Sequence, residues 1–216
     1  MQATERTRVR RHPERGAYDA ETIHAILDAG FLCHVGFVDD GQPFVVPTLY
    51  CRVGDTLYLH GSPLSRMAQR LQDSPLCVTV THVDGVVVAR SGFNSSINYR
   101  SVMILGAGQL VEDKEAKLAA MNALIDQVVP GRSAEARPPT RNELKATAII
   151  AVCINEASAK LRSGPPGDPS KDRKLDIWAG VIPMTQQISA PVPSPDLPAG
   201  VPVPDSVIRM VRDGTE

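Results

Sequence analysis

The 216-residue sequence predicts a mainly antiparallel β-barrel with peripheral helices, an α+β fold. From residue 31 to about residue 109, short β-rich runs are separated by the turns Asp40-Gly41, Gly54-Asp55 and Asp84-Gly85, which are typical of hairpins. No helical stretch separates these runs, as a parallel α/β sheet would require. With 43% hydrophobic residues, the chain can bury one sizeable core. These observations favour a small antiparallel barrel.

Six strands are expected in this region, and a strongly apolar seventh strand closes the sheet. Their approximate ranges are 31–38, 43–51, 56–60, 76–82, 85–92, 101–112 and 145–156. One helix is expected from the N-cap Asp19 to Gly30. A second helix from Lys114 to Val128 carries apolar residues at helical spacing, and Pro130-Gly131 ends it. Both helices are expected to pack on the barrel.

The two ends of the chain are expected to lie outside the barrel. Residues 1–18 form an Arg-rich arm that we expect to be flexible, and residues 19–183 form the barrel domain. Residues 184–216 form a Pro-rich extension, which cannot join a central sheet because proline lacks the backbone N–H. The Gly- and Pro-rich stretch 163–170 is predicted to be a mobile loop.

Composition argues against several classes of partner. The formal net charge is −1, with 23 basic and 24 acidic residues, so no overall field favours nucleic acid or an anionic membrane. The longest apolar runs are far shorter than the roughly 20 residues that span a bilayer, and the first 16 residues have no apolar stretch of a secretory signal. We therefore expect a soluble, cytoplasmic protein. The four cysteines have no metal-binding spacing and are interpreted as buried free thiols, with no metal site.

The stretch from His60 to Arg66, His-Gly-Ser-Pro-Leu-Ser-Arg, reads as a strand end that leads into a helix. Ser62 is the expected N-cap, with Pro63 at the first helical position. Free backbone N–H groups, the Ser65 hydroxyl and the Arg66 guanidinium together form a suitable phosphate site. The alternative is a plain helix cap with a solvated Ser65 and an exposed Arg66.

Two further features allow more than one interpretation. An apolar strand begins with the polar residues Tyr99, Arg100 and Ser101. They are either solvent-exposed residues at the edge of the sheet or part of a binding site. Trp178, the only tryptophan, is either a core or interface anchor or a ligand contact. Gly106-Ala-Gly108 lies within a predicted strand and lacks the third glycine of a dinucleotide-binding fingerprint.

Taken in order, several pieces of the sequence resemble a known family. They are Arg11-His-Pro-Glu-Arg15, Pro43-Phe-Val-Val-Pro-Thr-Leu-Tyr50, Leu57-Tyr-Leu-His-Gly-Ser62 with Ser65-Arg66, Tyr99-Arg-Ser-Val102 with Gly106, and Trp178-Ala-Gly180. In this order and spacing they resemble the flavin-binding split barrels related to pyridoxamine phosphate oxidase, in the branch that includes nitroimidazole-resistance proteins.

The resemblance implies a homodimeric split barrel that holds FMN at the subunit interface. It places the flavin ring along Val46, Pro47, Thr48, Leu49 and Tyr50, and the phosphate at His60, Gly61, Ser62, Ser65 and Arg66. Arg100, Ser101 and Trp178 complete the site, in part from the other subunit. His60 is also the candidate residue on the substrate side.

The sequence departs from the oxidase proper at two points. Met67 follows Arg66, where the oxidase commonly has a lysine, and the closing Arg-Leu-His-Asp-Arg segment that binds pyridoxal is absent. We therefore expect an FMN-dependent oxidoreductase that reduces a small organic acceptor, such as a nitro compound or a quinone. Two alternatives stay open. One is a carrier or sensor without turnover that binds flavin or haem, with His60 or His34 as haem ligand; the other is a deazaflavin-dependent reductase.

Overall fold

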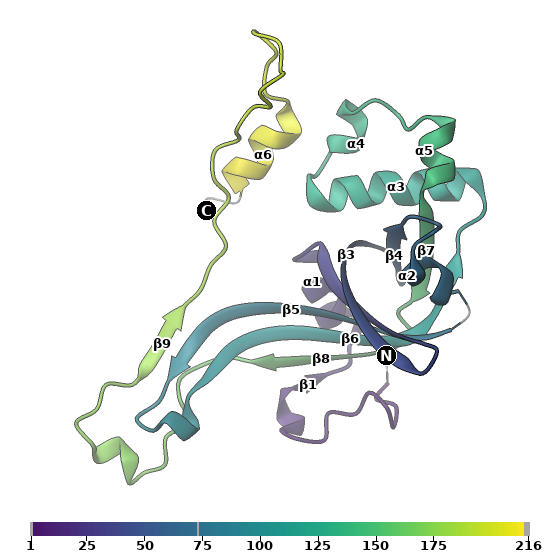
Figure 1. Ribbon diagram of the computed structural model, residues 1–216. Helices are drawn as coiled ribbons and strands as arrows, with labels where there is room; N and C mark the ends of the chain where they lie inside the picture. Colours follow the sequence, from purple (N-terminus) through teal and green to yellow (C-terminus); the bar gives the residue numbers. More distant parts are fainter. Residues whose placement is uncertain (1, 73, 214–216) are drawn as a thin grey trace.

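The computed structural model describes residues 2–72 and 74–213, in which six antiparallel strands form a partly closed ring (Figure 1). They are β2 (Leu32–Asp39), β3 (Gln42–Val53), β4 (Thr56–Gly61), β5 (Pro75–Val88), β6 (Ser96–Leu110) and β7 (Ala148–Cys153). Around the ring the order is β6-β7-β4-β3-β2-β5, and β5 pairs back to β6. Closure is partial because β6 reaches β7 only through its last three residues, 108–110.

Three more strands extend the ring at its edges. β8 (Glu156–Arg162) pairs with β6, and β1 (Gly16–Ala17) pairs with β8. β9 (Gly180–Pro183) pairs with the far end of β5. Together, β5 and β6 form a long curved ribbon that leaves the barrel and carries β9 beside its end (Figure 1).

The core fills the ring and is closed at one end by α1 (Ala20–Asp28). Asp19 caps this helix as predicted, since its carboxylate accepts a hydrogen bond of 2.7 Å from the backbone N–H of Thr22. Tyr50 points into the core, and its hydroxyl donates to the backbone oxygen of Leu27 at 2.5 Å. Burial raises the pKa of the Tyr50 phenol.

The other helices cover the outside. α3 (Lys114–Val128) has the predicted bounds and buries Ala120 and Leu124 against β3 and β7. The short helices are α2 (Arg66–Arg70), α4 (Arg132–Glu135), α5 (Arg141–Ala146) and α6 (Asp205–Asp213), with 3-10 turns η1 (Pro13–Arg15), η2 (Gly92–Asn94) and η3 (Asp172–Lys174). No helix within 2–72 and 74–213 is long and apolar enough to cross a bilayer.

Three of the predicted strands are wrong in their bounds, and the strand predicted at 101–112 begins earlier, at Ser96. The expected strands 76–82 and 85–92 are one strand, β5, with a register irregularity between Val83 and Gly85 in place of a turn. Gly85 is required there, because a Cβ on it would lie 2.9 Å from the backbone oxygen of Ile182 in β9. The expected strand 145–156 is divided among the end of α5, β7 and the start of β8.

The ends of the chain pack more closely than predicted. In the N-terminal segment, Thr7 is only 2% exposed, and Thr4 and Arg6 hydrogen-bond to Glu156 at the start of β8. The segment therefore lies along the sheet where a flexible arm was expected. In the Pro-rich extension, α6 packs on α4, because the backbone N–H of Ser206 donates to Glu135 at 3.0 Å.

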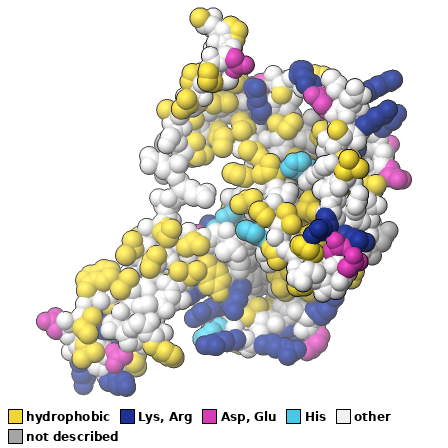
Figure 2. Space-filling view, viewed as in Figure 1, with side chains coloured by type: hydrophobic (Ala, Val, Ile, Leu, Met, Phe, Trp, Pro, Cys, Tyr) yellow, Lys and Arg dark blue, Asp and Glu magenta, His cyan; other side chains and the backbone are white. Residues whose placement is uncertain are grey.

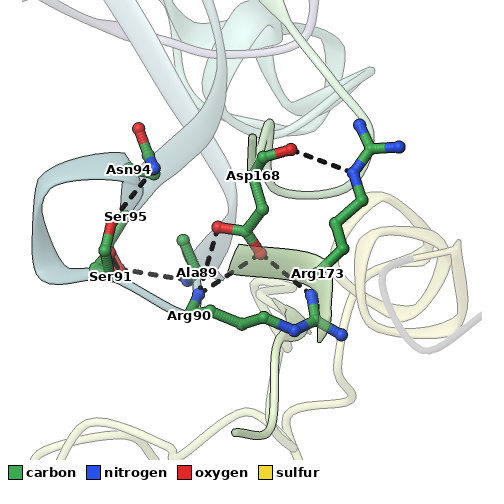
Figure 3. A network of polar contacts seen from close by, with 7 residues as sticks. All are labelled: Ala89, Arg90, Ser91, Asn94, Ser95, Asp168 and Arg173. Carbon is green, nitrogen blue, oxygen red and sulfur yellow. Dashed lines mark hydrogen bonds and ion pairs between the residues drawn. The ribbon is translucent and has the colours of Figure 1, made fainter. Parts of the chain in front are cut away.

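The Gly- and Pro-rich loop 163–170 is also anchored (Figure 3). Asp168 is 3% exposed and accepts hydrogen bonds from the backbone N–H of Arg90 at 3.2 and 3.3 Å. The guanidinium of Arg90 pairs with the same carboxylate at 2.9 Å. A loop predicted to be mobile is thus fastened to the chain just beyond β5.

The cysteines are free, as predicted, but they are not all buried. Cys33 and Cys51 are buried, and burial raises the pKa of each thiol to about 12. Cys77 is partly buried and Cys153 is exposed. In the described part of the chain, no group of three or more His, Cys, Asp or Glu side chains has an arrangement that could hold a metal ion.

Gly108→Ala should lower the free energy of unfolding by about 1–3 kcal/mol, the range for overpacking a core. A Cβ at this position would lie 2.4 Å from the backbone oxygen of Leu71 and 2.6 Å from the Ile150 side chain. Gly106→Ala is the matched control, since its Cβ would make an ordinary 3.5 Å contact with Val152. Urea denaturation of both variants measures the difference, and equal stability of the two would contradict the steric argument.

Candidate functional site

β3 has an unpaired edge where the ring opens. Residues 42–49 pair with β2 on one side, whereas β4 pairs only with residues 50–53. Backbone N–H and C=O groups on the β4 side of residues 42–49 therefore lack a strand partner in the described part of the chain, and such groups require other hydrogen-bonding partners. The Thr48 hydroxyl lies at this gap and donates to the backbone oxygen of His60 at 3.4 Å.

Next to this edge is an apolar pocket of about 360 Å³. It is lined by residues of β3, the end of β4, α3 with the residue after it, and the residue before β7. These are Leu49, His60, Met121, Leu124, Ile125, Val128, Val129 and Thr147. Among the described residues, no carboxylate or ammonium group lines it. The Nδ1 atom of His60 is buried and has no hydrogen-bond partner among the described residues, so an imidazole in this pocket is available to a ligand.

The turn from His60 to Arg66 differs from the prediction. Ser65, and not Ser62, is the N-cap: its hydroxyl accepts from the backbone N–H of Ala68 at 3.2 Å, and α2 has only five residues. The Ser62 hydroxyl accepts from the backbone N–H of Leu64 at 3.2 Å. The predicted first helical residues, 63–65, are not helical. They belong to a separate turn, in which the backbone N–H of Ser65 donates to the backbone oxygen of Ser62 at 2.9 Å.

Arg66 already has partners within the chain. Its Nε atom lies 3.2 Å from the Asp39 carboxylate, and its guanidinium stacks over the Phe44 ring at 4.4 Å. Arg70 pairs with the same carboxylate at 2.5 Å. Phosphate binding by this turn therefore stays a prediction. To bind a phosphate group, Arg66 would have to release the Asp39 carboxylate.

The predicted residues of β3 face two ways. Tyr50 is buried in the core, and Val46 packs partly against it. Pro47 is exposed on the outward face, and Leu49 lines the apolar pocket. Along this strand, a ligand can thus reach the free backbone edge and the side chains of Pro47 and Leu49, but not the Tyr50 side chain.

The third predicted cluster is spread out. The Arg100 guanidinium holds Asp84 at 2.9 Å, and this hydrogen bond raises the pKa of Arg100. Ser101 donates to the backbone oxygen of Lys160 at 3.2 Å on the outer face of β6. Trp178 precedes β9 and is 66% exposed, so it is not a core residue of the single chain. The structure therefore brings Leu49 and His60 together but does not place Arg100 or Trp178 in the same pocket.

A cavity missed by the sequence analysis lies between the N-terminal segment and the outer face of the sheet. It has a volume of about 420 Å³. Its lining residues are Arg6, Thr7, Arg8, Val9, Arg10, Arg11, Thr79, Thr81, Ser101, Val102, Met103, Ser158 and Lys160. In Figure 2, dark blue Lys and Arg side chains gather over this lower part of the molecule. The arginine-rich start of the sequence is the available signal for this cavity, although its composition predicts a flexible arm.

The fold and the open edge of β3 define a split barrel with a ligand-sized opening, and comparison with known proteins is consistent with this class. The chain belongs to the pyridoxamine 5'-phosphate oxidase family, whose sequence model matches residues 19–161. This confirms the family inferred from the motifs. A search of curated protein sequences found no match.

Two solved structures are similar over nearly the whole chain. The flavocytochrome Anf3 from Azotobacter vinelandii is 41% identical, with a TM-score of 0.92 over 97% of this chain and 98% of that one. The FAD and haem binding protein from Mycobacterium smegmatis is also 41% identical, with a TM-score of 0.87 over 93% and 97%. A 5-nitroimidazole antibiotic resistance protein from Bacteroides thetaiotaomicron has a TM-score of 0.57 at 24% identity over 67% and 85%, which supports the fold.

Proposed function

We propose that the protein is a flavin-binding oxidoreductase that also binds haem. The observation that carries this proposal is the 41% identity, over 97% of the chain, to a protein described as a flavocytochrome. A second protein at 41% identity is described as binding FAD and haem. The sequence predicts FMN, and the similarity to this second protein favours FAD as the flavin.

The open edge of β3 fits the ring of a flavin. Its free backbone donors and acceptors over residues 46–49 match the polar edge of the ring, and Pro47 and Leu49 supply apolar surface. When bound, the flavin supplies hydride and electron transfer, and the protein supplies binding, orientation and electrostatics. A small organic acceptor, such as a nitro compound or a quinone, remains our proposed substrate class.

The lining of the apolar pocket beside this edge has the chemistry of a haem site. Haem iron in proteins is commonly held by a histidine, and His60 is the histidine that lines this pocket, with an unpartnered Nδ1. α3 supplies the apolar wall through Met121, Leu124 and Ile125. His34, the other candidate, is exposed on the outward face of β2 and does not line this pocket. We therefore assign the haem ligand to His60 instead of the substrate-side role.

We also propose a homodimer, with the outward face of the barrel as its interface. Leu32, Val38 and Val45 lie on the outer surface of β2 and β3 and are 51%, 58% and 68% exposed. Several exposed apolar side chains on one face of a sheet are typical of interaction sites. Figure 2 shows hydrophobic side chains on both sides of the hollow between the C-terminal extension and the barrel. Sedimentation velocity of the full chain tests this, and a monomer at all concentrations would contradict it.

The visible absorption spectrum of the purified protein tests the proposed function. We expect flavin bands together with a Soret band, and we expect acid extraction to release FAD. Adding FAD and haemin to protein purified with low occupancy should raise its melting temperature, since ligands that bind the native state stabilise it. A colourless protein whose thermal stability is unaffected by FAD, FMN and haemin would refute the proposal.

A further inference from the structure

The cavity under the N-terminal segment has the chemistry of an anion site. Its floor is the outer face of β5, β6 and β8, where the hydroxyls of Thr79, Thr81, Ser101 and Ser158 line it. Its opposite wall is the segment 6–11, which supplies four arginines. Within 2–72 and 74–213, no aspartate or glutamate lines it. Hydroxyl and guanidinium groups are the usual ligands of phosphate oxygens.

Some of the cations of this cavity are already neutralised and others are not. Arg6 pairs with Glu156, and Arg10 pairs with Glu5 at 2.6 Å. Arg8, Arg11 and Lys160 have no carboxylate partner among the described residues. Three like charges around one cavity repel each other, and a bound anion of two or three charges removes that cost.

We propose that this cavity binds the diphosphate group of a dinucleotide, an inference that rests on the proposed redox function. The volume of about 420 Å³ exceeds the needs of one phosphate and lies within the range of small-molecule sites, about 300–1,000 Å³. Arginine holds phosphate oxygens in a bidentate manner, and lysine acts as a point charge beside them. A dinucleotide that carries two adjacent phosphates supplies the matching charge.

The cavity shares one face of the sheet with the flavin edge. Strand register places Pro47, His34, Thr79, Met103 and Ser158 in a single row from β3 to β8. Neighbouring strands lie about 5 Å apart, so Thr79 at the cavity is roughly 10 Å from Pro47 along the sheet. A dinucleotide with its diphosphate in the cavity therefore extends over His34 toward β3. By contrast, the side chains of Ser62, Ser65 and Arg66, predicted to bind phosphate in the turn 60–66, all have contacts within the chain.

Two dinucleotides carry this group in redox chemistry, FAD and the nicotinamide dinucleotides, and one experiment separates them. The full-length chain is titrated with FAD, FMN and NADH by fluorescence, in the wild type and in the double variant Arg8→Ala/Arg11→Ala. Both side chains are exposed, so the fold should tolerate their removal. The control Arg141→Ala/Lys145→Ala removes two cations from α5, on the opposite side of the molecule (Figure 1).

We expect the double variant to bind FAD at least about tenfold more weakly, because each hydrogen bond to a charged group contributes about 1.5–3 kcal/mol. FMN carries only the first of these two phosphates, so its binding should weaken less than that of FAD. The control should leave both unchanged, and FAD binding should weaken with added salt. If NADH binding falls and FAD binding does not, the cavity holds the nicotinamide dinucleotide. If neither falls, the proposal is overturned, and an effect on FAD from Arg66→Ala alone would move the anion site to the turn. A wild type that binds NADH but no flavin would refute the proposed function. The NADH titration of the double variant would then still test whether the cavity binds a dinucleotide.

Discussion

His60→Ala should yield a protein that has lost its Soret band and kept its flavin. The imidazole lies at the end of β4, in a pocket whose other lining residues include no second histidine, cysteine or lysine. Met121 and the Thr147 hydroxyl are the other side chains there with a potential ligand atom. Removing the imidazole leaves the apolar pocket without its strong iron ligand, and haem affinity should fall by about a hundredfold or more, since outer partners of metal ligands alone are worth about 10–100-fold.

Two comparisons make this result specific to ligation. His34→Ala removes an exposed histidine from β2, which β3 separates from the strand of His60, and should leave the Soret band unchanged. Adding imidazole to the His60→Ala protein should restore a haem spectrum, because the free base can occupy the space of the missing side chain. A His60→Ala protein that retains its full Soret band, or a His34→Ala protein that loses it, would assign the ligand elsewhere.

The positions of the barrel strands could be predicted because each has its own local signal. Alternating apolar residues and Asp-Gly turns mark β2, β3 and β4 within a few residues of their observed bounds. The same signal failed at Asp84-Gly85, where the Asp84 carboxylate accepts from Arg100 on β6 and the chain continues in the same strand through a register irregularity. The sequence shows the Asp-Gly pair, but it does not show that Arg100 of the neighbouring strand pairs with Asp84.

The packing of the chain ends could not be predicted, because their partners are distant in sequence. The N-terminal segment is attached through Arg6 and Glu156, and α6 through Ser206 and Glu135. Arginine-rich and proline-rich composition favours an extended, solvated chain unless such partners exist. The cavity of Arg8, Arg11 and Lys160 follows from the same attachment, so it was missed for the same reason.

The candidate site was predicted in part. The resemblance pointed to β3 and the turn after β4, and the structure adds why they matter: β3 has an unpaired edge, and His60 faces an apolar pocket. It also shows that Arg66 is paired with Asp39, which lies 27 residues earlier in a different strand. Spacing within a motif predicts which side chains are near each other, and it does not reveal a carboxylate brought in by another hairpin.

Asp168→Ala should release the loop that precedes β9 and lower the local stability of that strand by about 2–4 kcal/mol. The carboxylate of Asp168 is the acceptor for both the backbone N–H and the guanidinium of Arg90 (Figure 3). Truncation leaves a partly buried cation without its partner, and the Nε atom of Arg90 is already buried without a hydrogen bond. Removing one member of a buried ion pair costs about 3–5 kcal/mol, and we take a lower range because Arg90 is 26% exposed.

Hydrogen exchange of the β9 amides measures this loss, because detachment of β9 from β5 exposes them without unfolding the barrel. β9 pairs with residues 85–88 of β5, directly before Arg90, so its protection depends on how firmly the preceding loop is held. Asp176→Ala is the control: this exposed carboxylate lies in the same loop, and its removal should change protection by no more than about 0.5 kcal/mol. Asp168→Asn keeps the shape but not the charge, and should fall between the two. Equal protection of β9 in all three variants would show that β9 is held by its pairing with β5 and not by the Arg90–Asp168 contact.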